Sequence, residues 1–340
     1  MRLLDLNIDI KDDKYESYYS YSFLSKFAKL GRNIINYEFK PTVSTTLGSL
    51  TDDILSYDIN YILKKYHIAN NILGESVLKT LIDDIILEIQ EKVININDID
   101  LLKKVISDII INRRIEVYYP NYKLESRVDK ILKEGYDYIK ELYLSRDKIV
   151  VNSELYNEAN QYATTIKTHD FTKRYFQENK NIETVNQFSG VSNIELEIDG
   201  KKITLDFKYI IDKLIIDHDK KEAQIIDYKI LEGSFITKYF SFRYDLQAYL
   251  YQNAIEKLLK KYYPAYVLLP FKFIYLNKKK SSSCLVIEVS NKTLKKVEND
   301  YEYENYKLTG IKTLIKDFNW FKSNNFEVEY PESIYINNGN

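Results

Sequence analysis

The chain has 340 residues, and its 49 basic and 50 acidic side chains give a net charge of −1 at pH 7. That balance is unlike a protein that coats nucleic acid through bulk electrostatics. Hydrophobic residues make up 45% and charged residues 29% of the chain, as in a globular protein with ample core. The single cysteine excludes a disulfide framework and a four-cysteine zinc or iron–sulfur site. No apolar run approaches the ~20 residues of a membrane span and the first residues are unlike a signal peptide, so we expect a cytoplasmic protein.

Helical patterns dominate the first half of the chain. Residues 15–31 predict a short amphipathic helix that is capped at Ser20 or Ser22, and a second helix is predicted to start at Thr45 or Thr46. From 60 to 183, apolar residues recur every three or four positions, as one buried helix face requires. A small basic patch follows, formed by Lys167, Lys173 and Arg174. We interpret it as a solvated helix face, with phosphate contact as the less favoured alternative.

The periodicity changes from helix to strand at Asn193. Asp199-Gly200 is a strong signal for a two-residue hairpin turn, and the resulting register pairs Leu196 with Ile203. The same register pairs Glu195 with Thr204. Glu195 and Asp206 then lie too far along the strands from Asp212 to take part in a site there.

A second hairpin follows, and its predicted turn is the polar run His218–Lys221. Its register pairs Leu214 with Ile225 and places Asp212 directly opposite Asp227. Opposed carboxylates in an antiparallel pair lie roughly 5 Å apart and repel each other unless a positive charge lies between them. Lys229 lies on the same face as Asp227, because strand side chains alternate with period two.

Such an acidic pair can hold Mg²⁺ or Mn²⁺ through oxygen ligands and activate a water for attack on a phosphoryl group. The alternative is a surface pair that is neutralised by nearby lysines. The pattern that follows favours the first interpretation, because Gln247 and Tyr251 lie four residues apart on one face of a predicted helix.

Asp212, then Asp227-Tyr228-Lys229, then Tyr-Asp-Leu-Gln-Ala-x-x-Tyr from Tyr244 resembles the PD-(D/E)XK nuclease superfamily, and most of all its RecB-like and bacteriophage recombination-exonuclease branch. The resemblance covers roughly residues 190–290, and it lacks the proline-aspartate that names the family. It implies that acids and a backbone carbonyl hold the metal, that a lysine orients or activates the attacking water, and that a Gln-x-x-x-Tyr helix supports the site. The resemblance assigns metal binding to Asp212, Asp227 and the Tyr228 carbonyl. It assigns the attacking water to Lys229, and the support of the site to Gln247 and Tyr251.

Two further residues enter through this resemblance. Gly48-Ser49-Leu50-Thr51-Asp52 is similar to an N-terminal element of the same branch, which implies that Asp52 completes the metal shell, with Asp53 the less favoured neighbour. The alternative is an ordinary acidic helical turn that the helix dipole favours. Arg243, just ahead of the Gln-x-x-x-Tyr helix, is a candidate phosphate contact for DNA binding.

The remaining sequence predicts two strands around 269–277 and 283–290, joined by a polar turn at 278–282. A long charged helix is predicted over 291–323, and 326–340 reads as a short strand or extended tail. The expected fold class is α/β, with a restriction-endonuclease-like core in which helices flank a central mixed sheet, and a large N-terminal helical region. The expected division is 1–190 for a helical region that contributes to the active site, 191–290 for the nuclease core and 291–340 for a helix and tail that pack on it.

The function expected from these features is that of a metal-dependent exonuclease on linear double-stranded DNA, with one or two Mg²⁺ or Mn²⁺ ions, acting in phage recombination, repair or replication. A phage-encoded protein would work in the host cytoplasm. No Walker A pattern occurs, so no nucleotide cofactor is expected. A single-strand annealing or single-strand-binding protein is a candidate partner, self-assembly is open, and no membrane is expected. The alternatives are an inactive nuclease-fold protein that binds DNA or assembles on it, and a metal-dependent endonuclease. Cleavage polarity, strand preference, processivity and oligomeric state are left open by the sequence.

Overall fold

The computed structural model describes residues 2–69, 76–91, 94–112, 120–145, 147–177 and 179–326, without the side chains of 90 and 91. The chain divides into two compact units, Met1–Ser56 with Gln161–Asn340 and, between them, Tyr57–Asn160. The borders of these units differ from residues 190 and 290, and the division expected at those positions stays a prediction. Each unit is described by itself.

The first unit begins with short helical segments and one short strand, η1 (Leu3–Leu6), η2 (Asp13–Tyr15) and β1 (Tyr19–Ser20). Helix α1 (Tyr21–Leu30) is capped by the Ser20 hydroxyl, which accepts from the Phe23 N–H, so Ser20 is the cap rather than Ser22. The 3-10 helix η3 (Gly31–Asn36) follows, and then α2 (Val43–Ser56), which starts before the predicted Thr45 or Thr46 and holds Asp52.

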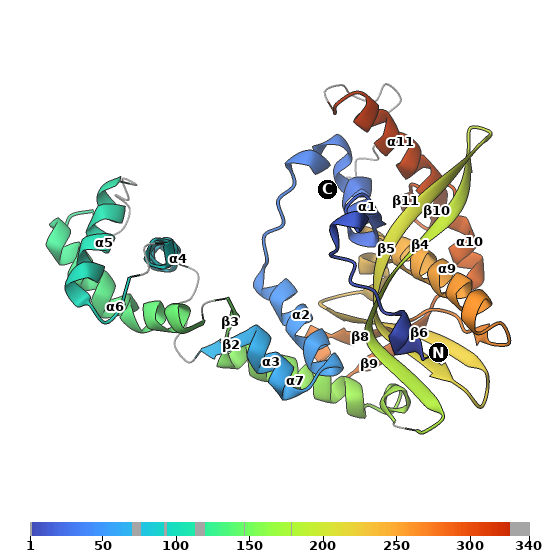
Figure 1. Ribbon diagram of the computed structural model, residues 1–340, viewed down its shortest axis with the longest axis horizontal. Helices are drawn as coiled ribbons and strands as arrows, with labels where there is room; N and C mark the ends of the chain where they lie inside the picture. Colours follow the sequence, from blue (N-terminus) through green and yellow to red (C-terminus); the bar gives the residue numbers. More distant parts are fainter. Residues whose placement is uncertain are drawn as a thin grey trace. The chain divides into compact units, whose positions relative to one another are not determined.

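One mixed sheet of seven described strands forms the centre of this unit (Figure 1). Its strands are β1, β4 (Ile182–Ile198), β5 (Lys201–Asp217), β6 (Glu222–Leu231), β7 (Val267–Leu268), β8 (Lys272–Asn277) and β9 (Cys284–Glu288). The main path is β1-β5-β6-β8-β9; β4 also pairs with β5, and β7 with β6. The β4–β5, β5–β6 and β8–β9 pairs are antiparallel, whereas β6–β8 is parallel.

The structure confirms both predicted hairpin registers. Leu196 pairs with Ile203 across β4–β5, and Leu214 pairs with Ile225 across β5–β6. Asp199 and Gly200 both have positive φ, at 50° and 74°, as a type I′ turn requires. Glu195 is exposed opposite Thr204, as expected for a residue outside the site.

Helices flank this sheet, which confirms the predicted α/β class (Figure 1). The most buried is α9 (Tyr244–Tyr262), which follows α8 (Phe235–Ser241) and contacts β4 and β5. Helix α1 packs against α9 and α11 (Ile311–Ser323). One hydrophobic cluster joins these elements, and it includes Phe27, Phe188, Leu250 and Phe273.

Two predicted boundaries were wrong. Strand β4 begins at Ile182, eleven residues before the predicted change of periodicity at Asn193. The helix predicted over 291–323 is broken into α10 (Asn291–Lys296), a hairpin of β10 (Tyr301–Tyr303) and β11 (Tyr306–Leu308), and α11. The alternation of aromatic and polar residues in the hairpin is the strand pattern that the helical prediction missed. The predicted tail at 327–340 lies outside the described residues.

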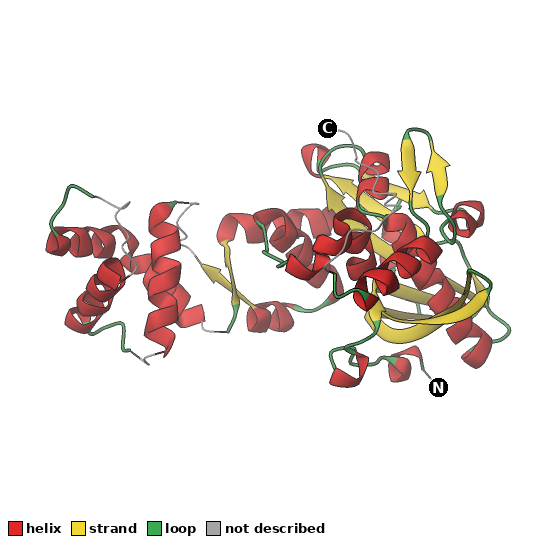
Figure 2. Ribbon diagram, turned by 90° about the horizontal axis from the view of Figure 1, so that it is seen from above, coloured by secondary structure: helices red, strands yellow, loops and turns green. Residues whose placement is uncertain are grey.

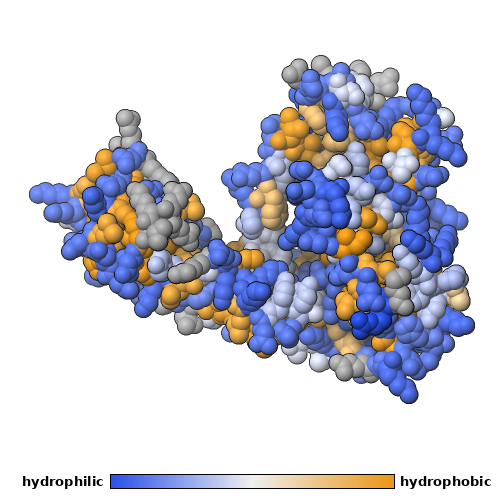
Figure 3. Space-filling model, in the orientation of Figure 1, coloured by the Kyte–Doolittle hydropathy of each residue, from blue (hydrophilic) through white to orange (hydrophobic). Residues whose placement is uncertain are grey.

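The described part of the second unit contains three longer helices, α4 (Val77–Glu91), α5 (Ile99–Asn112) and α6 (Leu124–Ser145) (Figure 2). These helices surround their own apolar cluster. Its other elements are α3 (Ile59–Lys65) and the parallel strands β2 (Tyr66–Ala69) and β3 (Ile149–Asn152). Helix α7 (Ser153–Thr168) leads out of this unit, and the 3-10 helix η4 (Lys173–Phe176) follows it. Apolar side chains also remain on the surface of this unit (Figure 3). Leu87, Ile111 and Leu144 are among its exposed residues. Among the described residues, no helix is both long and apolar enough to cross a bilayer.

Candidate active site

The site forms where strand β5 changes the face that it buries. Phe207, Tyr209 and Ile211 are buried before Asp212, at odd positions, whereas Leu214 and Ile216 are buried after it, at even positions. Strand side chains alternate, so the strand must twist or bend at this point for both sets to enter the same core. Gln187 lies opposite on β4 with φ of 50°, the left-handed backbone that marks an irregularity in a strand.

Asp212 and Asp227 lie opposite each other in the continued register, as predicted, just past the last paired residues of the ladder, Lys213 and Ile226. At this point the carboxylate of Asp212, instead of a backbone carbonyl of β5, accepts a hydrogen bond from β6. Its Oδ2 accepts from the backbone N–H of Tyr228 at 2.8 Å, and its Oδ1 accepts from Gln187 Nε2 at 3.4 Å. The orientation of Asp212 is therefore fixed by a backbone N–H of β6 and by a side-chain amide from β4.

Asp227 is the most deeply buried acid of the site, at 1% exposure. Its Oδ1 accepts from Gln247 Nε2 at 2.6 Å, which ties β6 to helix α9. Its Oδ2 pairs with Lys229 Nζ, and Lys229 itself is only 14% exposed in its side chain. The predicted proximity of Asp212, Asp227, Lys229 and Gln247 is therefore present in the structure.

Aromatic rings surround the ammonium group of Lys229. Its Nζ lies 4.7 Å from the ring centre of Tyr244 and 5.6 Å from that of Phe273, distances at which a cation is attracted to a ring face. Burial alone would lower the pKa of Lys229, but Asp227 and the neighbouring Tyr244 and Asp212 raise it well above its usual value. Lys229 is therefore an ammonium cation in this arrangement.

The acids of the site are difficult to ionise. Burial, and then the charge of Asp227, raise the pKa of Asp212 to about 7. Burial also raises the pKa of Asp227, although Lys229 opposes that effect. The pKa of Asp52 lies well above its usual value because the group is buried and the charge of Asp212 is near. Carboxylates that repel each other in a buried place are the arrangement that a bound cation relieves.

Asp52 reaches this site from α2, which contacts both β5 and β6. Its Oδ1 is buried and has no hydrogen-bond partner among the described residues. Asp212, Lys229 and Asp227 all act on it electrostatically. The structure thus brings the N-terminal helix to the site through Asp52, where the resemblance implies it.

Tyr251 and Tyr228 also lie at the site. Tyr251 is buried one turn after Gln247 on α9, and the charges of Asp227 and Asp212 act on its hydroxyl and raise its pKa, after burial as the main cause. The ring of Tyr228 stacks on Phe176 with centroids 6.1 Å apart. The Tyr228 N–H holds Asp212, and the part of its carbonyl as a metal ligand stays a prediction.

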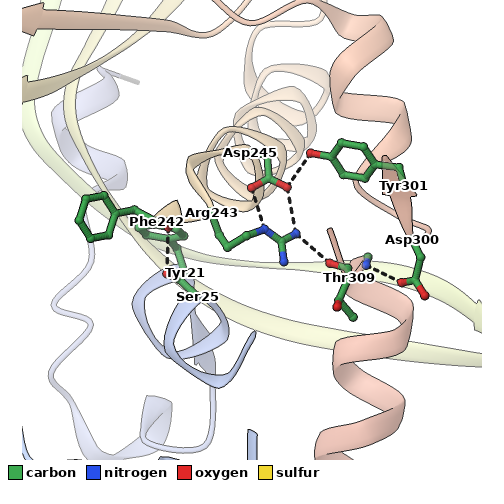
Figure 4. A network of polar contacts seen from close by, with 9 residues as sticks. Tyr21, Ser25, Phe242, Arg243, Asp245, Asp300, Tyr301 and Thr309 are labelled. Atoms are coloured by element: carbon green, nitrogen blue, oxygen red, sulfur yellow. Dashed lines mark hydrogen bonds and ion pairs between the residues drawn. The ribbon is translucent and has the colours of Figure 1, made fainter. Parts of the chain in front are cut away.

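Arg243 does not lie where a phosphate contact would need it. Its guanidinium is buried, at 6% exposure for the residue, and donates to both carboxylate oxygens of Asp245 at 3.0 and 2.9 Å and to the Thr309 carbonyl at 2.8 Å (Figure 4). Arg243 also adopts φ of 56° and ψ of 42° at the junction of α8 and α9. Both the backbone and the side chain of Arg243 are therefore committed to the start of α9, which corrects the expectation that it contacts DNA.

The oxygens at the site fit a divalent cation in kind. Asp52, Asp212 and Asp227 are hard oxygen ligands, and the partnerless Oδ1 of Asp52 needs a positive or donating partner. The described side chains include no group of three His, Cys, Asp or Glu already gathered as a metal site. Lys229 holds Asp227 instead, so binding of a cation to Asp227 would compete with that ion pair.

No protein-family model matches the chain, and no curated protein matches it. Among solved structures, the chain is similar to a crystal structure of a protein from Eubacterium rectale that is named a "putative exonuclease". The identity is 13%, the alignment covers 95% of this chain and 89% of the other, and the TM-score is 0.43. A likeness of this size establishes neither a shared fold nor a shared activity.

Three residues that lie around the acids in the structure were not predicted from the sequence. Gln187, whose amide reaches Asp212, lies 25 residues away on β4, and no local pattern marks it. Tyr244 opens the Tyr-Asp-Leu-Gln pattern, so its place one turn ahead of Gln247 was a signal for its contact with Lys229. Tyr21 lies near Lys229 and Asp227, and its hydroxyl donates to the Phe242 carbonyl at 2.6 Å (Figure 4).

Proposed function

We propose that the protein is a metal-dependent deoxyribonuclease of the PD-(D/E)XK superfamily that acts as an exonuclease on linear double-stranded DNA. The observation that supports this most is the buried pair Asp212 and Asp227 on adjacent strands, with Lys229 and Gln247 on Asp227 and the partnerless oxygen of Asp52 nearby. Such a group is costly to fold without a counter-charge, and hydrolysis of a phosphodiester uses the cation that would relieve it.

In this proposal Asp52, Asp212 and Asp227 hold one or two Mg²⁺ or Mn²⁺ ions, with the Tyr228 carbonyl as a further ligand. The cation, when bound, polarises the phosphoryl group and lowers the pKa of a water. Gln247 holds one oxygen of Asp227 and so leaves the other to Lys229 or the cation. Tyr251, buried beside these groups, supports the helix that presents Gln247.

Lys229 has two consecutive tasks in this proposal. While it pairs with Asp227 it is an ammonium donor, which can orient a water or a phosphoryl oxygen. If a cation were bound to Asp227, the attraction that raises the pKa of Lys229 would be lost, and burial, which lowers that pKa, would remain. Lys229 would then release its proton to bulk water and, as a neutral amine, could accept a proton from the attacking water.

The setting of this activity is proposed on the resemblance: phage recombination, repair or replication in the host cytoplasm, with a single-strand annealing or single-strand-binding protein as partner. An endonuclease and an inactive DNA-binding protein of the same fold are the competing functions. Asp227 and Asp212 argue against inactivity, because an inert protein gains stability when such carboxylates are replaced.

The experiment uses an end-labelled linear duplex and a covalently closed circle of the same DNA, incubated with Mg²⁺, with Mn²⁺ or with EDTA. We expect metal-dependent loss of the linear DNA only, and no loss with Lys229→Ala. Cutting of the circle would identify an endonuclease. If neither DNA is cut with either metal, the catalytic proposal is wrong and the inactive binding protein remains.

A further inference from the structure

A hollow of about 360 Å³ lies beside strand β9, outside the acidic site. It is lined by Asp170, Phe171 and Arg174, from the segment between α7 and β4, and by Leu285 and Val286 of β9. Its volume is near the lower end of the range of about 300–1,000 Å³ that small-ligand sites occupy. The proposed cleavage mechanism uses none of these residues.

An exposed aromatic ring dominates this hollow. Phe171 is 61% exposed, and Leu285 on β9 is 47% exposed. The backbone of Phe171 is fixed, because its N–H donates to Nδ1 of His169 at 3.3 Å and the two rings lie 5.3 Å apart. The hollow therefore presents a positioned ring and aliphatic side chains to the solvent, which suits a flat apolar ligand.

The charges at the rim favour an anion. Arg174 is exposed and donates to the Tyr175 hydroxyl at 2.7 Å, with its guanidinium 4.8 Å from that ring. No ion pair joins Arg174 to a carboxylate of the described residues. Asp170, the acid of the rim, is paired with Lys173 at 2.6 Å, and that hydrogen bond lowers its pKa. The rim thus keeps an unneutralised guanidinium, the group best suited to a phosphate.

This hollow is joined to the acidic site by a short piece of the same unit. Arg174 belongs to η4, and two residues later Phe176 stacks on Tyr228 at 6.1 Å between centroids. The backbone N–H of Tyr228 holds Asp212. The hollow and the acidic site are therefore connected through η4 and Tyr228.

We propose that the hollow binds one unpaired nucleotide of the DNA, with its base stacked on Phe171 and its phosphate held by Arg174. The choice of DNA as the ligand rests on the proposed function. A stacking ring beside an arginine is how proteins bind single strands without reading sequence. A peptide added to the edge of β9 would use the backbone of that strand, and it would leave the exposed ring of Phe171 and the charge of Arg174 without a use.

The experiment measures binding of a short fluorescein-labelled oligothymidylate and of a blunt hairpin duplex by anisotropy, in EDTA so that no DNA is cut. We expect Phe171→Ala to weaken binding of the single strand about tenfold and Phe171→Tyr to restore it, with little change for the duplex. Arg174→Gln should reduce the slope of log affinity against log salt by about 0.7. Phe39→Ala removes a ring with 55% exposure elsewhere in this unit and serves as the matched control.

A direct signature is available from Phe171→Trp, whose emission a stacked thymine should quench. Unchanged single-strand affinity in Phe171→Ala, or the same loss in Phe39→Ala, would overturn the proposal. Cleavage of linear duplex with Mg²⁺ is measured separately on each variant. Normal cleavage with unchanged single-strand binding would refute the hollow alone, whereas Phe171-dependent binding without any cleavage would refute only the nuclease.

Discussion

Asp212 accepts a hydrogen bond from the backbone N–H of Tyr228 at the point where β5 and β6 stop pairing, directly after the pair of Lys213 and Ile226. The carboxylate thus substitutes for the next rung of the ladder, and it lies beside the carboxyl group of Asp227. Because that hydrogen bond favours ionised Asp212 while burial and Asp227 oppose it, protonation of Asp212 is sensitive to its surroundings.

Asp212→Asn should stabilise the protein in EDTA at alkaline pH. A carboxyl with a raised folded pKa contributes stability that is present below its unfolded pKa, near 4, and is lost as pH rises through its folded pKa of about 7. The gain should therefore be small at pH 4 and roughly 1–3 kcal/mol above pH 7. Chemical denaturation at several pH values measures it, and an equal gain at pH 4 and pH 8 would contradict the electrostatic explanation.

Lys229→Met should separate metal binding from cleavage. Removing the ammonium leaves Asp227 without its ion pair, so we expect Mn²⁺ to bind at least as tightly as in the parent, while DNA cleavage falls by about 10³-fold or more. Titration calorimetry and a cleavage assay measure the two effects. A loss of Mn²⁺ affinity comparable with the loss of cleavage would show that Lys229 helps to build the metal site.

Gln247→Glu tests the contact of α9 with the acid. The amide donates to Asp227 Oδ1 at 2.6 Å, and a glutamate cannot donate there when it is ionised. We expect a loss of about 2–3 kcal/mol in EDTA from the repulsion of buried carboxylates, and partial recovery on addition of Mn²⁺. Gln252→Glu, five residues on in the same helix, is the control, and its stability should not recover with Mn²⁺.

Arg243→Met should damage folding and not DNA binding by itself. It leaves Asp245 buried and charged, so we expect a loss of about 3–5 kcal/mol, partly recovered in the double variant Arg243→Met with Asp245→Leu. Thermal and denaturant unfolding measure both. If the single variant is as stable as the parent but binds duplex DNA more weakly, Arg243 is a phosphate contact after all.

Two glycines should respond to alanine in opposite directions. Gly48 lies one turn before Asp52 within α2, and a Cβ there would meet nothing within 4 Å, so Gly48→Ala should stabilise the helix by about 0.5–1 kcal/mol. At Gly310 a Cβ would lie 2.2 Å from the backbone of Asn299, so Gly310→Ala should be destabilising. Differential scanning calorimetry compares them. If Gly48→Ala is more stable but cuts DNA poorly, DNA passes over that face of α2.

The sequence predicted the hairpin registers because turn chemistry and alternation act within a few residues. Asp199-Gly200 and the run His218–Lys221 each allow only a few pairings, and the predicted ones pair Leu196 with Ile203 and Leu214 with Ile225. The proximity of Asp212 and Asp227 follows from that local logic. The position of Gln247 near Asp227 was predicted only with the help of the family resemblance, because no local sequence pattern indicates that α9 lies against β6.

Contacts between residues far apart in the sequence could not be predicted from local patterns. Arg243 was predicted to contact DNA because its carbonyl partner, Thr309, lies 66 residues away in the sequence. Its ion-pair partner, Asp245, belongs to the Tyr-Asp-Leu-Gln pattern, which does not indicate an ion pair. The interruption of the predicted helix before Gly310 could not be recognised from the sequence, because only the close approach of the Asn299 backbone shows why glycine is required there. The contact of Gln187 with Asp212 could not be predicted either, since it forms only when β4 and β5 are paired.

The most direct test of the central claim is Mg²⁺-dependent cleavage of linear duplex DNA by the parent protein and by Asp227→Asn, at equal concentrations of folded protein. We expect cleavage by the parent that EDTA abolishes, and a loss of about 10³-fold or more in Asp227→Asn. No cleavage by the parent with Mg²⁺ or Mn²⁺, or equal cleavage by both proteins, would contradict it.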